Sequence, residues 1–278
     1  LDEAAVDRAA GEVVYEGHVT SVEAIPMGVP FDTIERTAGI WTEDSFMSLI
    51  EGKFDVPSGT QIGVGVDRLD YTKGIEERLR ALERVWETYP AWRGEFTYVQ
   101  IGSESRSKIR AYRQIQERVG EAVERINGRF RTDDWQPIVY TTDRLSQEEL
   151  YGLFRHSALG IVSPLRDGMN LVAQEYVAAQ KDAKGILLLS DQAGTYDEYG
   201  EYALSITPTD TEDFARTITR ALDMSPVERR IRMRALRESV ADNDLDTWME
   251  KNVISGLRKT ESGARVASAQ WKPSESQS

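Results

Sequence analysis

The chain of 278 residues is 40% hydrophobic and carries 34 basic and 47 acidic side chains, a formal net charge of −13. This composition is typical of a globular protein with a sizeable core. The acidic balance argues against a nucleic-acid partner, because binding a phosphate backbone needs a basic surface. No apolar run approaches the ~18 residues of a membrane span, and residues 1–10 lack the basic-then-apolar order of a signal peptide. We therefore expect a cytoplasmic protein without a membrane segment.

The chain has no cysteine and only two histidines, His18 and His156. The missing thiols exclude disulfides, thiolate metal sites and a cysteine nucleophile. We expect neither a metal nor a cofactor. His156 ends a predicted helix, where a cation is favourable, so we interpret it as structural. His18 supports no assignment.

The predicted elements begin late in the chain. Residues 1–60 show no regular alternation, and the extended segment 18–30 suits a linker or the edge of another domain. From residue 61 onward, short apolar runs alternate with amphipathic helices. The predicted strands are 61–66, 96–101, 138–141, 159–163, 186–190 and 203–206. The predicted helices are 74–89, 106–127 (ended by Gly128), 146–156, 170–180, 211–223 and 226–257.

This alternation predicts an α/β fold. Strands separated by helices of ten or more residues form parallel pairs with right-handed crossovers. Six such strands describe one doubly wound, Rossmann-like sheet, in which ligands bind at the carboxyl ends of the strands. The polar, serine-rich residues 261–278 indicate a disordered tail.

The first strand end carries a candidate anion site. Arg68 and Lys73 lie in the loop between strand and helix, beside Gly74 and the start of the helix. Two cations next to free backbone N–H groups suit a diphosphate. The alternative is that Arg68 pairs with Asp67 or Asp70 while Lys73 is solvated.

The strand end after residue 163 carries a second candidate site. A helix begins at about Asn170, and its first N–H groups would favour a phosphate. Asp167 in the loop and Glu175 in the second helical turn suggest two roles, one near a sugar ring and one on ribose hydroxyls. The alternative is a helix-capping Asp167 and a surface Glu175. Four apolar residues already account for the buried face of this helix, namely Leu171, Val172, Tyr176 and Val177.

A third strand end leads to Arg106, at the start of a predicted helix. A cation there is unfavourable against the helix dipole unless an anion lies nearby. Arg106 is therefore a candidate for a second phosphate.

Taken together, these loops closely resemble the trehalose-6-phosphate synthase family. The resemblance rests on residues 67–74, on Gly128 after residues 125–127, and on residues 163–173, in that order. It extends from about residue 24 to about residue 257, and residues 25–29 are similar to the hinge segment of that family. It covers most of this chain but only the C-terminal half of the family's chain.

The resemblance implies the GT-B architecture, in which two Rossmann-like domains face each other across a cleft. It also implies an enzyme that transfers glucose, with retention, from a nucleotide-glucose (usually UDP-glucose) to glucose 6-phosphate, giving trehalose 6-phosphate. Such a reaction needs no protein nucleophile and no metal. Cations and a helix dipole stabilise the leaving diphosphate, whose oxygen takes the acceptor's proton on the same face of the sugar.

Carried over position by position, the resemblance assigns the candidate residues. Arg68 and Lys73 would bind the donor diphosphate, Asp167 would contact the transferred glucose, and these three are the catalytic candidates. Arg106 would bind the acceptor phosphate, and Glu175 the ribose. The remaining donor-binding candidates are Leu145, Gly168, Met169, Asn170, Leu171, Val172 and Ala173. Leu145 falls where the family presents backbone to the base, and some relatives have an aromatic residue there.

The resemblance also predicts the domain organisation. Residues 1–30 would be a remnant of an N-terminal domain with its hinge, 31–260 the nucleotide-sugar domain with C-terminal helices, and 261–278 the tail. Leu1 would then be a truncation point, and the missing N-terminal domain, which supplies the acceptor loop, a partner. We expect the chain to bind nucleotide-sugar weakly and not to turn over alone. The resemblance allows a homo-oligomer.

Two other functions stay open at this point. A glucosylglycerol-phosphate synthase would share the cleft but use another acceptor, although Arg106 and the 68–70 segment favour glucose 6-phosphate. A non-catalytic, nucleotide-sugar-binding regulatory module is the second alternative. The base preference of the donor has no side-chain signature in this sequence.

Overall fold

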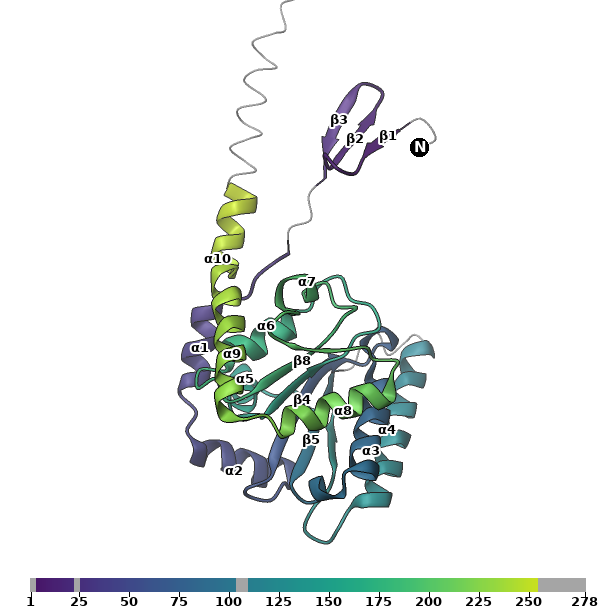
Figure 1. The fold of residues 1–278 in the computed structure, drawn as a ribbon, viewed down its shortest axis with the longest axis vertical. Coiled ribbons are helices and arrows are strands. Elements are labelled where there is room, and N and C mark those ends of the chain that lie inside the picture. The colour runs from purple at the N-terminus through teal and green to yellow at the C-terminus, as the bar shows by residue number, and fades with distance from the viewer. Residues whose placement is uncertain (1–3, 23–25, 104–109, 255–278) are drawn as a thin grey trace, which may run out of the picture. The chain divides into compact units, whose positions relative to one another are not determined.

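The computed structural model describes residues 4–22, 26–103 and 110–254. The chain divides into two units, Gly28–Leu245 and a smaller one made of residues 1–27 and 246–278. Figure 1 shows the elements of both units.

The larger unit is built on a six-stranded sheet in which every neighbouring pair of strands is parallel. The strands are β4 (Gln61–Arg68), β5 (Phe96–Ser103), β6 (Ile138–Thr141), β7 (Leu159–Val162), β8 (Ile186–Ser190) and β9 (Leu204–Ile206). Their order, β6-β5-β4-β7-β8-β9, reverses direction between β4 and β7. This is the doubly wound order whose switch point forms a ligand crevice. The predicted Rossmann-like α/β fold is confirmed.

Helices cover both faces of this sheet, and two apolar clusters lie between the layers (Figure 1). One face carries α1 (Phe31–Gly39), α2 (Glu43–Phe54), α5 (Gln147–His156), α6 (Leu171–Ala179) and α9 (Pro226–Asp242). The other carries α3 (Ile75–Thr88), α4 (Arg110–Phe130) and α8 (Thr211–Leu222). The shorter helices are η1 (Tyr71–Lys73), η2 (Pro90–Trp92) and α7 (Tyr196–Tyr199). Among the described residues, no helix has the length and apolar character needed to cross a membrane.

The structure adds two helices that the sequence pattern missed, α1 and α2. Helix α1 begins without a side-chain cap. The cap of α2 pairs Thr42 with Ser45, and the helix ends at Asp55 in a left-handed conformation instead of at a glycine. The start of α1 and the end of α2 therefore lack the usual signals, and the capping box of α2 has serine in place of the usual Glu or Gln.

Two predicted helix boundaries were wrong. Gly128 does not end α4, which continues to Phe130 because the buried stripe goes on through Ile126 and Phe130. The predicted helix 226–257 is interrupted after Asp242. The chain turns there, and the N–H of Leu245 donates to the carbonyl of Val29.

The smaller unit holds a three-stranded antiparallel sheet and a helical segment, both without buried residues in the described part. The strands are β1 (Ala5–Asp7), β2 (Glu12–Tyr15) and β3 (His18–Ser21), and the helices are α10 (Leu245–Trp248) and a π-helix (Met249–Ile254). His18 lies exposed on β3. The predicted boundaries at residues 30 and 260 stay predictions, and the predicted tail lies outside the described residues.

Candidate functional site

The candidate site lies at the switch point, where the carboxyl ends of β4 and β7 meet. A pocket of about 200 Å³ opens beside them. It is lined by Val66, Asp67, Arg68, Lys73, Ser103, Asn170 and Val172. A larger hollow of about 650 Å³ lies along residues 123–133, at the end of α4, which leads to the amino-terminal edge of the sheet. The switch-point pocket joins loops that carry charged side chains at the carboxyl ends of the strands.

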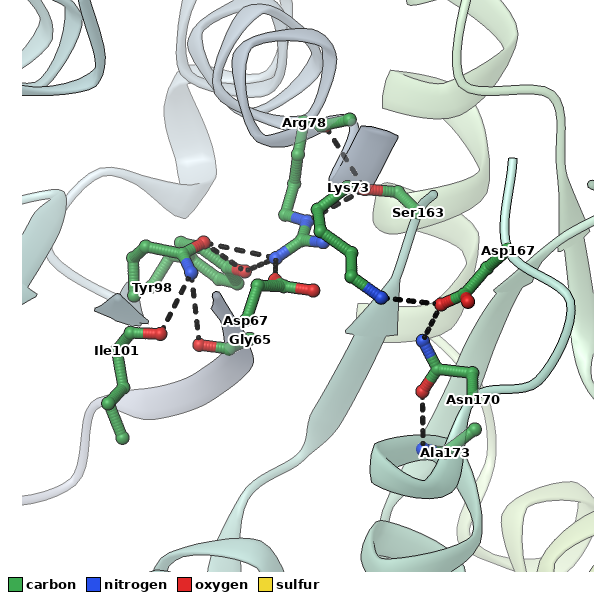
Figure 2. A network of polar contacts seen from close by, with 12 residues as sticks. Gly65, Asp67, Lys73, Arg78, Tyr98, Ile101, Ser163, Asp167, Asn170 and Ala173 are labelled. Carbon is green, nitrogen blue, oxygen red and sulfur yellow. Dashed lines mark hydrogen bonds and ion pairs between the residues drawn. The ribbon is translucent and has the colours of Figure 1, made fainter. Parts of the chain in front are cut away.

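Lys73 and Asp167 form an ion pair across this pocket, with Lys73 Nζ 2.6 Å from Asp167 Oδ2 (Figure 2). Their side chains are 14% and 16% exposed. Asn170 Nδ2 donates to the same carboxylate oxygen at 3.1 Å. The interpretation of Lys73 as a solvated cation is therefore wrong. Its ammonium carries three donors, so it can hold Asp167 and still bind an anion.

Arg68, at the end of β4, is exposed, and no described residue forms an ion pair or hydrogen bond with its guanidinium. Asp67 pairs instead with Arg78, and Asp70 accepts from the N–H of Thr72 as the cap of η1. The alternative pairing of Arg68 with either aspartate is thus wrong. The pocket holds a cation that the described chain does not neutralise.

Helix α6 begins at the pocket and is capped by Asn170. Asn170 Oδ1 accepts from the N–H of Ala173 at 3.1 Å, while its amide group holds Asp167. The helix cap is therefore Asn170, and the interpretation of Asp167 as the cap is wrong. The earlier amides of the first turn, those of Leu171 and Val172, have no partner within the helix, so they remain available to an anion.

Glu175 lies in the second turn of α6 and is only partly exposed. No described residue forms a hydrogen bond or ion pair with its carboxylate. Burial raises the pKa of Glu175 to about 6. The pKa of Tyr151 is also raised, first by its own burial and second by the charge of Glu175. A simple surface glutamate would not have these properties, so its interpretation as one is wrong.

The other predicted residues lie elsewhere or carry less information. Leu145 precedes α5 and packs partly buried against the core. Gly168 and Met169 are exposed in the loop before α6. Arg106 lies outside the described residues.

His156 ends α5, which leads into the amino-terminal end of β7, away from the pocket. Its ring stacks on Phe46 with centroids 4.8 Å apart. Burial lowers the pKa of His156, despite the nearby Trp41 carbonyl and the Glu43 carboxylate. This packing agrees with the structural role predicted for it.

Arg78 was not predicted from the sequence. This residue on α3 is fully buried next to the pocket and pairs with Asp67 at 2.7 Å. A signal was present, because a charged residue interrupts the apolar face of the predicted helix 74–89. Tyr98 and Gln100 likewise place polar groups inside a predicted buried strand.

Comparison with known proteins relates the whole chain to a family. The model of "Glycosyltransferase family 20" matches residues 1–258. A curated trehalose-6-phosphate synthase from Enterobacter sp. (strain 638) is 42% identical over 197 residues, which is 70% of this chain and 41% of that protein.

Two solved structures are similar over nearly the whole chain. An alpha,alpha-trehalose-phosphate synthase (UDP-forming) from Burkholderia xenovorans in complex with glucose-6-phosphate has a TM-score of 0.83 and 35% identity, covering 89% of this chain and 54% of its own. The structure described as "Trehalose-6-phosphate from E. coli bound with UDP-2-fluoro glucose" has a TM-score of 0.83 and 34% identity, covering 92% and 55%. The chain thus spans about half the length of these relatives.

Proposed function

We propose that this chain, which belongs to glycosyltransferase family 20, binds a nucleotide-glucose, with UDP-glucose as the first choice, at the switch-point pocket. The bound sugar would be the donor for transfer to glucose 6-phosphate, giving trehalose 6-phosphate with retention. The observation that carries this proposal is that Arg68, the Lys73 ammonium and the start of α6 meet in one pocket, and that Arg68 has no partner among the described residues. The similarity to proteins solved with UDP-2-fluoro glucose and with glucose-6-phosphate supports the choice of ligands.

The donor diphosphate would bind to Arg68, to Lys73 and to the first N–H groups of α6. Asp167 orients the Lys73 ammonium, whose remaining protons point to phosphate oxygens. These donors stabilise the negative charge that develops on the leaving diphosphate, which is the main catalytic contribution in this kind of site.

The sugar and ribose would contact carboxylates. Asp167 Oδ1 is not used by Lys73 or Asn170, which both bind Oδ2, so it can accept from a glucose hydroxyl. Glu175 would accept from the ribose. In the transfer, the bond between the anomeric carbon and the diphosphate oxygen breaks, and the acceptor oxygen forms the new bond on the same face. The acceptor's proton passes to the leaving oxygen, so no protein nucleophile is needed.

Calorimetry on the purified chain tests the donor assignment. We expect UDP-glucose to bind, with ADP-glucose and GDP-glucose as the comparison for the base. Arg68→Ala should weaken binding by about tenfold or more, since one lost charged contact is worth at least about 1.4 kcal/mol. Arg216→Ala, on the exposed face of α8, is the matched control and should bind as the wild type does.

Two results would contradict the proposal: no binding of any of the three nucleotide sugars, or equal affinity in the Arg68→Ala variant. Adding glucose 6-phosphate or glycerol 3-phosphate to the donor-bound chain then separates the two candidate acceptors.

A further inference from the structure

Arg78, near the start of α3, has no exposed surface. Its Nη1 lies 2.7 Å from Asp67 Oδ2 and donates to Tyr98 Oη at 2.9 Å and Gln100 Oε1 at 3.0 Å. Its Nε donates to Ser163 Oγ at 2.8 Å. As Figure 2 shows, one guanidinium thus connects α3 to β4, to β5 and to the end of β7.

The partners of Arg78 are neighbours of the residues that form the pocket. Asp67 lines the pocket and precedes Arg68 in β4. Ser163 directly follows β7 and opens the loop that carries Asp167. Beyond the paired part of β4 and β7, Arg78 therefore bridges the two strand ends that lead to Arg68 and Asp167.

The packing around this guanidinium is close. A Cβ on Gly65 would lie 2.3 Å from Arg78 Nη1, and a Cβ on Gly74 would lie 2.0 Å from the carbonyl oxygen of Ser163. The absence of a side chain at Gly65 leaves space for a charged group in a place where apolar residues could also fill the core. Because buried ion pairs can often be replaced by apolar residues without loss of stability, stability alone does not account for the network.

Electrostatics gives Arg78 a second effect on the pocket. The pocket lining contains one carboxylate, that of Asp67, beside the cations Arg68 and Lys73. An uncompensated Asp67 would repel a diphosphate. Burial alone would lower the pKa of Arg78, but the Asp67 carboxylate and the hydrogen bonds outweigh burial and raise it, so the guanidinium stays charged.

We propose that Arg78 is a positioning residue for the donor diphosphate: it joins the ends of β4 and β7 and neutralises Asp67 without touching the ligand. This inference rests on the donor binding proposed above and extends it to a residue outside the pocket lining.

Two variants of the full chain separate these effects. Arg78→Met leaves Asp67 charged and unpaired beside the pocket, so both the thermal midpoint and the affinity for UDP-glucose should fall. The double variant Arg78→Met with Asp67→Asn removes both charges. It should recover most of the thermal midpoint and still bind UDP-glucose on the order of tenfold more weakly, as expected when the support of a site is lost.

Hydrogen exchange gives a readout without ligand. In the double variant, the amides of residues 66–75 and 163–170 should exchange faster than in the wild type. The guanidinium bridge between the two strand ends is lost there, and weaker links such as the bond from the N–H of Leu165 to the carbonyl of Thr72 remain. Arg78→Lys keeps the charge without the forked donors, so it should regain only the part of the affinity that depends on neutralising Asp67.

Arg229→Met is the matched control. Arg229 is a second buried arginine, on α9, and it donates to backbone carbonyls such as those of Met224 and Ala158. Its loss should lower the thermal midpoint without changing donor affinity or the exchange of residues 66–75 and 163–170.

The outcomes separate this inference from the proposed function. A wild-type chain that does not bind UDP-glucose contradicts the proposed function. Unchanged exchange in both segments of the double variant overturns the role of Arg78, whether or not the donor binds. A double variant that binds UDP-glucose as tightly as the wild type also overturns it, with the proposed function intact.

Discussion

At the scale of single residues, Glu175 at the candidate site lowers the free energy of unfolding at neutral pH. Its carboxylate is half-buried without a partner among the described residues, and burial raises its pKa from 4.5 to about 6. The folded state therefore binds its proton more tightly than the unfolded chain does. Between about pH 4.5 and 6, this contribution lowers the free energy of unfolding as the pH rises, and above pH 6 the full penalty is present.

Glu175→Gln should remove this penalty. The shift corresponds to at most about 2 kcal/mol at neutral pH, and access of water to the half-buried group reduces it to about 1 kcal/mol. We expect the variant to be more stable than the wild type at pH 7.5 and equal to it at pH 4, in urea titrations. Its affinity for UDP-glucose should fall, because an amide is a weaker acceptor for the ribose hydroxyls.

The exposed Glu201 provides the control, and Glu201→Gln should change neither quantity. A stability difference for Glu175→Gln that does not depend on pH would contradict the argument.

Only some residues of the candidate site could be predicted from the sequence. The pattern made Arg68, Lys73 and Asp167 candidates because each follows a predicted strand, and the structure brings them to one edge of the sheet. The pattern missed Arg78, whose role depends on partners from three strands that no spacing along α3 reveals. Whether Arg68 or Arg78 pairs with Asp67 is decided by the sheet that brings these residues together.

At the scale of elements, the turn between β4 and α3 depends on Gly74. This residue has a φ of +62°, and a Cβ on it would lie 2.0 Å from the carbonyl oxygen of Ser163. Gly59, in the turn before β4, has a φ of +84°, but a Cβ on it would meet no neighbouring atom within 4 Å. The two glycines therefore share a backbone conformation and differ in their surroundings.

Gly59→Ala should cost about 1 kcal/mol, the price of the left-handed conformation alone. Gly74→Ala should cost clearly more, because the backbone at Ser163 must also move. Urea titrations of both variants measure the difference. Gly74→Ala should in addition weaken binding of UDP-glucose, since its displacement separates Lys73 from Asp167, whereas Gly59→Ala should leave binding unchanged. Equal costs for the two substitutions would show that the contact with Ser163 relaxes freely.

The elements were predictable where an apolar run and the start or end signal of a neighbouring helix agreed. All six strands of the large sheet were found, because apolar runs alternated with capped amphipathic helices. Helix α1 was missed because it has no side-chain cap, and α2 because its capping box has Ser45 where Glu or Gln is usual. The boundary at Gly128 failed because packing of Phe130 outweighs the tendency of glycine to end a helix. Local signals thus located the elements, and tertiary contacts decided their ends.

At the scale of the whole molecule, the core and the candidate site belong to one part of the chain. Every residue of the two apolar clusters lies between Val29 and Val240. The pocket lining lies between Val66 and Val172. The described residues outside Gly28–Leu245 include none that is buried.

A chain limited to residues 28–245 should therefore fold by itself, because it keeps all of the apolar burial that stabilises the sheet. We expect a thermal midpoint within a few degrees of that of the full chain and the same affinity for UDP-glucose, measured by calorimetry on both. A shorter chain, 61–245, lacks α1 and α2 and so exposes part of the first cluster, including the residues that packed against Ile34 and Ile50. It should be clearly less stable. If the 28–245 chain were stable but bound the donor more weakly, residues outside it would contribute to the site, and the pocket at the switch point would not be the whole of the donor site.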